Sequence, residues 1–343
     1  MCVIAEKNTF CEAVKVRHFV STARKMVNST EGGNVNVMKP LLSANVRVGL
    51  YIAIAAVNIF FSITASLGNI LILIALRKVI SIHPPTKLLF QCLAITDLGV
   101  GLTCQPLIAT LMLLVDNIDI KIWNTMYCPL FSSLSVTFCG ASVFASAALS
   151  VDRLLALFLG YRHVVTLKRI RAVLASGCLA LLLTVLVWNF RTKPAGIIIT
   201  IFLTLYLIIS LSSYTKIALR LRQHQSSKVR DNAQQGRSNT GGIPLNLERY
   251  KRTVVSIALV QLALFICYFP FLIFRIVTHL KDIHPGLYLL WYSHTTTLVF
   301  LNSSLNPCLY CWRIKEIIQA VKGTIRRFCA CLSQGTSTLS TNQ

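Results

Sequence analysis

The residues best able to do chemistry in this chain are polar groups that stand inside long apolar stretches. Asp97 lies ten residues into one of them, in the run LAITD. A carboxylate at the centre of a membrane helix costs about 2.5–3.5 kcal/mol on insertion scales, so Asp97 is expected to face other polar groups. Oxygen ligands from three predicted helices would be Asp97, Ser142, Asn302, Ser303 and Asn306. Such a set suits a hard cation, and we predict a sodium ion at this position.

Two alternatives to the ion stay open. Asp97 can be protonated, or it can simply be hydrogen-bonded to Asn69 and Asn306. Polar residues in membrane helices also serve as plain interhelical hydrogen-bond partners, which needs no ion. That interpretation suits one isolated residue better than a group gathered around one carboxylate.

Seven apolar stretches carry these residues, and their lengths predict the fold. Apolar residues make up 55% of the 343 residues and charged residues 13%, roughly half the charged share of a soluble domain. A membrane helix needs about 20 mostly apolar residues. The predicted spans are about 48–76, 88–115, 124–158, 171–190, 194–220, 250–275 and 286–311. The sequence therefore predicts an all-α membrane protein, a seven-transmembrane helix bundle over 48–311, and excludes a soluble enzyme and an outer-membrane barrel.

Lysine and arginine predict the orientation of the bundle. The loops after the first, third and fifth spans carry sixteen basic residues, and those after the second, fourth and sixth carry five. This asymmetry places the first set in the cytoplasm. The tail 1–47, with Asn28 in a glycosylation sequon, is then extracellular, and the tail 329–343 is cytoplasmic. The net charge of +23 reflects topology and attraction to anionic membrane lipids, and nucleic-acid binding is not expected.

The segment after the seventh span predicts a short helix in the membrane interface. Between 312 and 328 the apolar residues fall on one helical face and the basic residues on the other. Cys329 and Cys331 follow directly and are candidate palmitoylation sites, which would hold the end of this helix at the membrane.

Two prolines and one cation are expected to give the bundle movable parts. Pro270 and Pro307 each remove a backbone hydrogen bond, so the sixth and seventh spans should kink there. Arg153 is the only cation inside the low-charge stretches, and Asp152 stands beside it as a local partner. An arginine that snorkels from a helix end is the alternative interpretation of Arg153.

Five short patterns and one cysteine stand in order on the predicted spans. They are Gly68-Asn69, Leu93-Ala94-x-x-Asp97, Asp152-Arg153-Leu154, Cys267-Tyr268-Phe269-Pro270 and Asn306-Pro307-Cys308-Leu309-Tyr310, with Cys128 located 25 residues before Arg153. Each is weak alone. As a set they fall in order on the first, second, third, sixth and seventh spans. The chain thus resembles the rhodopsin-like (class A) G-protein-coupled receptors, in which Cys128 would be the disulfide cysteine.

The resemblance implies a function. Such a receptor couples an extracellular ligand to a heterotrimeric G protein at the plasma membrane, is not an enzyme, and can recruit arrestin through a phosphorylated tail. It implies that Arg153, held by Asp152 at rest, is released to meet Tyr214 and a G-protein helix. The residues of this activation switch would be Asp152, Arg153, Tyr214, Tyr268, Pro270, Asn306, Pro307 and Tyr310.

The chain departs from the family pattern at several positions. Tyr268 replaces the expected tryptophan, Leu264 the expected phenylalanine, and Tyr206 stands where the fifth span would have its proline. The loop FRTKPA is short and has no cysteine to pair with Cys128. The short loop and missing proline are shared with the melanocortin, cannabinoid and lysolipid receptors. The chain is weakly similar to the group that these receptors form with the adenosine receptors. The effect of these departures on basal activity is left open.

The resemblance also places a ligand site in the outer half of the second, third, sixth and seventh spans. Where amine receptors carry an aspartate, this chain has Ser135, so we expect a small non-amine ligand. Arg275 is the one charge near this region, and it either pairs with an acidic, largely apolar ligand or snorkels to lipid headgroups. The candidate ligand-binding residues are Phe131, Ser135, Val136, Cys139, Phe271, Leu272, Arg275, Tyr292, Thr296 and Phe300.

Two other classes of protein are weighed against the receptor. A seven-helix transporter or ion pump would need a chain of ionisable groups across the bilayer, whereas Asp97 stands alone at mid-depth. A non-signalling decoy receptor would keep the spans and lose the cytoplasmic motifs, yet Arg153, Tyr214 and Tyr310 are present. The sequence favours the signalling receptor and specifies neither its ligand nor its G-protein subtype.

Overall fold

The structure is a computed structural model, and it describes eight ranges of the chain. They are residues 44–114, 122, 126–159, 166–189, 193–234, 245–281, 285–313 and 317–327. The predicted glycosylation site Asn28 and palmitoylation sites Cys329 and Cys331 lie outside these ranges. Cys128 and Tyr214 lie in helices, but their side chains are outside the described part of the structure.

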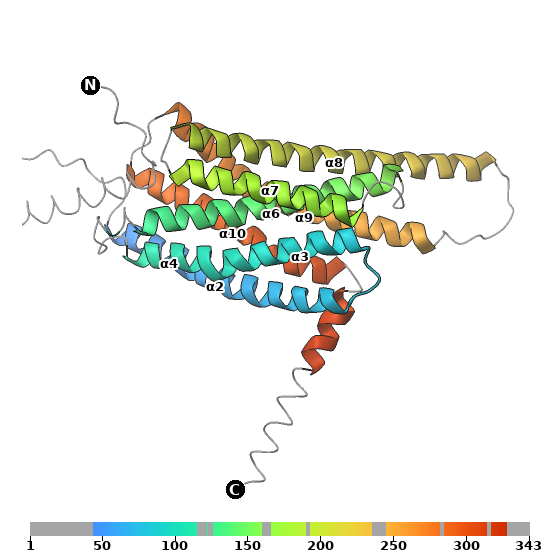
Figure 1. Cartoon of the computed structure of the whole chain (residues 1–343), viewed down its shortest axis with the longest axis horizontal. Coiled ribbons are helices and arrows are strands. Elements are labelled where there is room, and N and C mark those ends of the chain that lie inside the picture. The colour runs from blue at the N-terminus through green and yellow to red at the C-terminus, as the bar shows by residue number, and fades with distance from the viewer. Residues whose placement is uncertain are drawn as a thin grey trace, which may run out of the picture.

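Long helices that run side by side make up the described residues, which contain no strand (Figure 1). Their bounds are α2 Ala44–Lys78, α3 Pro84–Gly99, the π-helical segment η1 Val100–Cys104, α4 Gln105–Leu114, α6 Cys128–Leu159, α7 Leu167–Asn189, α8 Lys193–Gln234, α9 Leu245–Leu280 and α10 Pro285–Arg313. The second predicted span is α3, η1 and α4 together. α8 and α9 are helical well beyond the predicted bounds 194–220 and 250–275.

Six of these elements are long and apolar enough to cross a membrane: Val46–Lys78, Pro84–Leu114, Pro129–Leu155, Leu167–Leu186, Gly196–Ile217 and Leu262–Leu280. The seventh, α10, is less apolar because it carries a row of polar side chains. Those side chains are buried inside the bundle: Ser293, Thr296, Asn302, Ser303, Ser304 and Asn306. A helix whose polar residues face its neighbours can cross a membrane at a lower mean hydropathy, because the lipid contacts only its other face.

The second span is not one uniform α-helix. Its middle widens into the π-helical segment η1, directly after Asp97 on α3. Ser62 of α2 donates a hydrogen bond to the carbonyl oxygen of Gly101 in this segment at 2.7 Å. Short π-helical segments occur frequently at functional sites, and this one joins α3 to α4.

Close contacts at two glycines set how near the helices approach. A Cβ on Gly68 of α2 would lie 2.9 Å from Cβ of Pro307, so α2 packs directly against the proline of α10. A Cβ on Gly99 of α3 would lie 2.3 Å from the ring of Phe138 on α6. Glycine is therefore required at both contacts because no side chain fits there.

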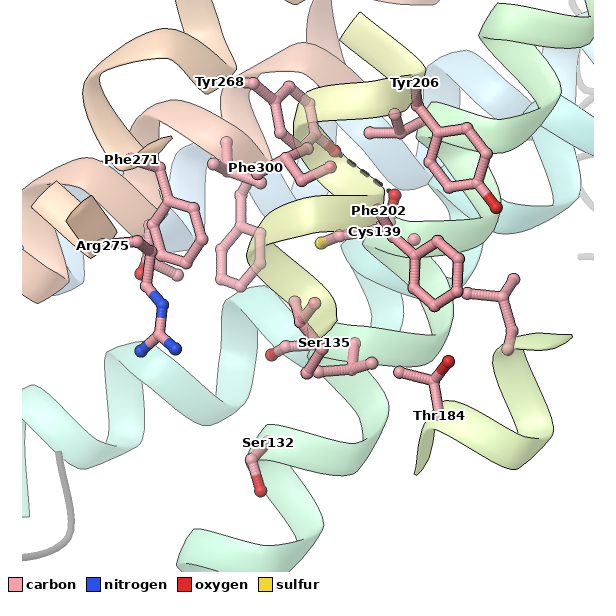
Figure 2. Close-up of a pocket in the computed structure, with 18 of the residues that line it drawn as sticks. Ser132, Ser135, Cys139, Thr184, Phe202, Tyr206, Tyr268, Phe271, Arg275 and Phe300 are labelled. Carbon is pink, nitrogen blue, oxygen red and sulfur yellow. Dashed lines mark hydrogen bonds between the residues drawn. The ribbon is translucent and has the colours of Figure 1, made fainter. Parts of the chain in front are cut away.

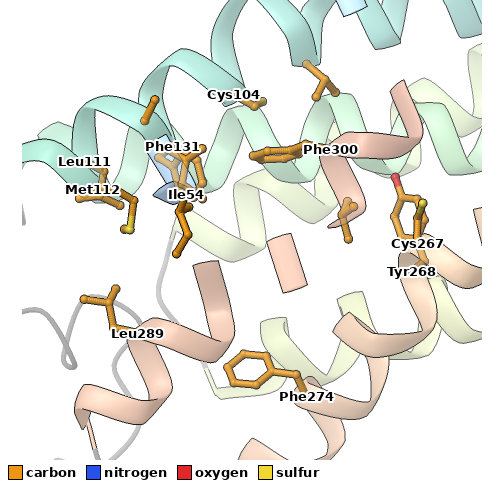
Figure 3. Packing of buried hydrophobic residues seen from close by; sticks show 14 of the residues in the cluster. Ile54, Cys104, Leu111, Met112, Phe131, Cys267, Tyr268, Phe274, Leu289 and Phe300 are labelled. Atoms are coloured by element: carbon orange, nitrogen blue, oxygen red, sulfur yellow. The ribbon is translucent and has the colours of Figure 1, made fainter. Parts of the chain in front are cut away.

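Two buried clusters fill the bundle. The outer cluster gathers large side chains from α2, α4, α6, α9 and α10, including Phe131, Tyr268, Phe274 and Phe300 (Figure 3). The inner cluster surrounds Tyr310 and extends to the helical residues 317–327, where Ile317 and Val321 are buried. These residues lie within the predicted interfacial helix 312–328 and turn away from the bundle axis (Figure 1).

We expect Gly99→Ala to destabilise the folded protein. The new methyl group would overlap the Phe138 ring, and overpacking of this kind costs about 1–3 kcal/mol. Gly49→Ala is the matched control because nothing lies within 4 Å of that position, and both variants share the higher helix propensity of alanine. Thermal unfolding of the purified receptor in detergent measures the difference, and equal midpoints for the two variants would refute the packing.

Candidate functional site

Asp97 lies at the centre of the bundle and is bonded to two other helices. Its side chain is fully buried on α3. Ser142 Oγ of α6 donates a hydrogen bond to Asp97 Oδ1 at 2.8 Å, and Asn306 Nδ2 of α10 donates one to Asp97 Oδ2 at 2.7 Å. Ser303 is a further hydrogen-bond partner of the carboxyl group. The structure thus brings four of the five predicted oxygen ligands together.

The amide of Asn69 does not donate to Asp97, as one alternative from the sequence had proposed. Its Nδ2 donates to the carbonyl oxygens of Ala65 at 2.9 Å and Ser303 at 3.1 Å. Asn69 therefore joins α2 to α10. Among the described asparagines, only Asn306 donates a hydrogen bond directly to the Asp97 carboxylate.

Three buried amide oxygens on α2 and α10 have no hydrogen-bond partner among the described residues. They are Oδ1 of Asn69, Asn302 and Asn306, and Asn302 lacks a partner for Nδ2 as well. All three side chains are fully buried, and each unsatisfied polar group costs about 1–3 kcal/mol. One carboxylate with several neutral oxygens is the donor set of a hard cation. These residues therefore fit a sodium ion.

Arg153 and Asp152 lie near the inner end of α6, beside α3. Asp152 Oδ2 accepts a hydrogen bond from Thr86 Oγ1 at 2.8 Å and lies 3.9 Å from Nε of Arg153. Both charged side chains are largely buried. Asp152 is therefore anchored to α3 and held close to its neighbour. Sequence reasoning missed Thr86, since a threonine two residues into a helix carries no signal of this contact.

Tyr310 is buried in the inner cluster. Its ring packs edge-on against Phe90 of α3, with 5.0 Å between the ring centroids, and its hydroxyl has no partner among the described residues. Pro307, three residues earlier, lies inside α10, and Pro270 lies inside α9. Both prolines therefore lie inside long helices, and the kinks expected there stay a prediction.

The residues that depart from the family pattern have defined surroundings. Tyr268 is buried and its hydroxyl donates to the carbonyl oxygen of Cys139 on α6 at 3.5 Å. Leu264 lies in the outer cluster. Tyr206 packs edge-on against Phe144 of α6, with 5.7 Å between the ring centroids. The tyrosine at 206 thus fills the contact between α8 and α6.

A cavity of about 150 Å³ lies between α6, α7, α8, α9 and α10, and Cys139, Tyr206 and Tyr268 belong to its lining (Figure 2). Eight predicted ligand residues line it: Ser135, Val136, Cys139, Phe271, Arg275, Tyr292, Thr296 and Phe300. Phe131 and Leu272 do not. They are buried in the outer cluster, where the ring of Phe131 packs edge-on against Phe300.

The wall that sequence reasoning missed comes from α7 and α8. It consists of Ala180, Leu181, Thr184, Ile199, Phe202, Leu203 and Tyr206. The second span was expected to contribute and supplies no lining residue among those described, because η1 and α4 pack against α2 instead. Arg275 is the only charged residue among the described residues that line the cavity.

Comparison with known proteins agrees with this architecture. The family model described as 7 transmembrane receptor (rhodopsin family) matches residues 68–195 and 191–310. Trace amine-associated receptor 9 from Homo sapiens is 24% identical over 328 residues, covering 86% of this chain and 90% of that receptor. Because the family match extends over most of the chain, this protein belongs to the rhodopsin family of seven-transmembrane receptors and is a G-protein-coupled receptor.

Proposed function

We propose that the chain is a plasma-membrane receptor, amino terminus outside, that transmits binding of a small non-amine ligand to a heterotrimeric G protein at its cytoplasmic end. The observation that carries this proposal is the position of Asp97. Its hydrogen bonds join α3, α6 and α10 between the outer cavity and Arg153. A ligand that binds one arrangement of these helices better shifts the population toward it.

The absence of an acid in the described cavity lining supports a non-amine ligand. The relative's name refers to trace amines, but Ser135 stands here where amine receptors of the family carry an aspartate. The described lining residues include no Asp or Glu. A desolvated ammonium group would meet Arg275 instead of a counter-charge, which opposes its binding.

A sodium ion at Asp97 is part of the same proposal. Asp97, Ser142, Asn302, Ser303 and Asn306 would hold it, and the ion would neutralise the buried carboxylate and stabilise the inactive arrangement. The unpartnered amide oxygens support this assignment over a simply hydrogen-bonded Asp97.

The termini complete the proposal. We assign a glycan to Asn28, palmitoyl groups to Cys329 and Cys331, and arrestin recruitment to the Ser/Thr-rich tail 329–343. We assign a disulfide to Cys128 with Cys2 or Cys11 of the amino-terminal tail as its partner. The basic residues of the cytoplasmic side attract anionic membrane lipids. A transporter or pump is not favoured, since the family is a class of receptors.

We expect Arg153→Ala to abolish G-protein activation while the receptor still reaches the cell surface. Arg153 is the buried cation near the inner end of α6, held beside Asp152. Nucleotide exchange on membranes from transfected cells measures the effect. Arg171→Ala, at an exposed position of α7, is the control. Wild-type exchange in the Arg153 variant would contradict the switch.

Sodium should raise the thermal unfolding midpoint of the purified receptor, and Asp97→Asn should remove that increase. An ion that binds only the folded state stabilises it by mass action, and the neutral amide no longer attracts a cation. Asn302→Ala should reduce the increase because it removes an unpartnered oxygen. Potassium chloride at equal concentration controls for ionic strength. If the wild type has the same unfolding midpoint in sodium chloride and in potassium chloride, the proposed sodium site is wrong, while the assignment as a receptor stands.

A further inference from the structure

The cavity holds one charge among neutral side chains. Arg275 Nη2 lies 3.5 Å from Nε2 of His279, one turn further along α9. Among the described residues no carboxylate forms an ion pair with this guanidinium. An arginine that lines a cavity without a carboxylate partner is available to an anionic group of a ligand.

Gly196 leaves open the space that the guanidinium occupies. A Cβ at Gly196 would stand 2.6 Å from Arg275 Nη2, so the absence of a side chain on α8 makes room for the charge. The guanidinium reaches from α9 to the outer end of α8 and remains part of the cavity wall. This position favours pairing with a ligand over snorkelling to headgroups.

The remainder of the cavity is apolar and open on one side. Its fully buried lining residues belong to α6, α9 and α10: Val143, Tyr268, Tyr288, Thr296, Val299 and Phe300. Those from α7 and α8 are all partly exposed, and Phe202 is 38% exposed. In a membrane this side faces acyl chains.

The size of the cavity limits how a ligand can lie in it. About 150 Å³ is less than the roughly 300–1,000 Å³ of common ligand pockets. Arg275 and Thr184 lie on opposite sides of the cavity (Figure 2). A ligand with its anion at Arg275 and a long apolar chain would therefore leave the cavity beside Thr184, between α7 and α8.

We infer that the ligand is a singly charged amphiphilic acid whose anion pairs with Arg275 and whose apolar chain leaves the cavity between α7 and α8 toward the lipid. Gly196 is the positioning residue for the arginine. The inference rests on the proposed function, because it names the ligand class of the same receptor.

Binding of decanoic acid to the purified receptor tests the headgroup. Decanoic acid should raise the thermal unfolding midpoint, while methyl decanoate and decylamine should not. Its apparent affinity should fall by roughly tenfold or more in Arg275→Ala and further in Arg275→Glu, with part retained in Arg275→Lys. Equal shifts for acid and ester, or an unchanged affinity in Arg275→Glu, would overturn the inference.

Variants of α7 test the exit of the chain. Thr184→Phe should fill the space between α7 and α8 and weaken the binding of decanoic acid. Benzoic acid has no chain, so it should bind the wild type and this variant with equal, weak affinity. Leu183→Phe is the matched control, since the adjacent Leu183 is 54% exposed and does not line the cavity. Equal losses in the two variants would overturn the proposed exit.

A double-mutant cycle tests the positioning role of Gly196. Gly196→Ala should weaken decanoic acid by displacing the guanidinium, and it should cause no further loss when Arg275 is already alanine, because coupled residues are not additive. Additive losses would contradict that role. Thermal shift reports binding without a G protein, so failure of decanoic acid to bind removes this ligand class, whereas failure of nucleotide exchange removes the proposed function.

Discussion

A carboxylate at the depth of the hydrocarbon core is the constraint on which the rest of this bundle depends. Asp97 cannot be left facing lipid, and its oxygens are satisfied by Ser142 of α6 and Asn306 of α10. Helices in a membrane have little hydrophobic reason to associate, so such bonds decide which faces meet. The close contact of Gly68 with Pro307 and the bond from Asn69 to the Ser303 carbonyl bring α2 to the same place.

α6 passes through the cavity, the Asp97 site and the level of Arg153, and α10 passes through the first two of these, which gives the coupling a physical route. α6 carries Cys139 in the cavity wall, Ser142 at Asp97, and Arg153 near the inner end. α10 carries Phe300 in the cavity wall and Asn306 at Asp97. A ligand that moves α10 relative to α6 must stretch or exchange the bonds to the carboxylate. The hydrogen-bonded group of Asp97, Ser142 and Asn306 is therefore the part of the bundle that can have two arrangements, which population shift requires.

The sequence predicted the buried polar residues, which stand out in apolar helices. It did not predict which apolar residues face the cavity, because that depends on how each helix is rotated about its axis. A buried acid, its oxygen partners and two prolines are visible as exceptions in an apolar run, and the structure gathers Asp97, Ser142 and Asn306 as expected. On α8, by contrast, Phe202 lines the cavity and its neighbour Ile201 does not. Both are apolar, so the pattern cannot distinguish the cavity face from the lipid face. The η1 segment and the Thr86 contact with Asp152 depend on tertiary packing in the same way.

The departures from the family pattern locate the moving parts. At the position of the fifth-span proline, Tyr206 keeps its backbone N–H, so α8 needs no proline kink there, and its ring is fixed between Phe144 and Phe202. Prolines remain inside α9 and α10, where the helix lacks a hydrogen bond and bends at lower cost. Both of these helices line the cavity, and α9 supplies Arg275. We therefore expect α9 and α10 to bend more easily than α8, so that an anion bound at Arg275 would act directly on a helix that can bend at its proline.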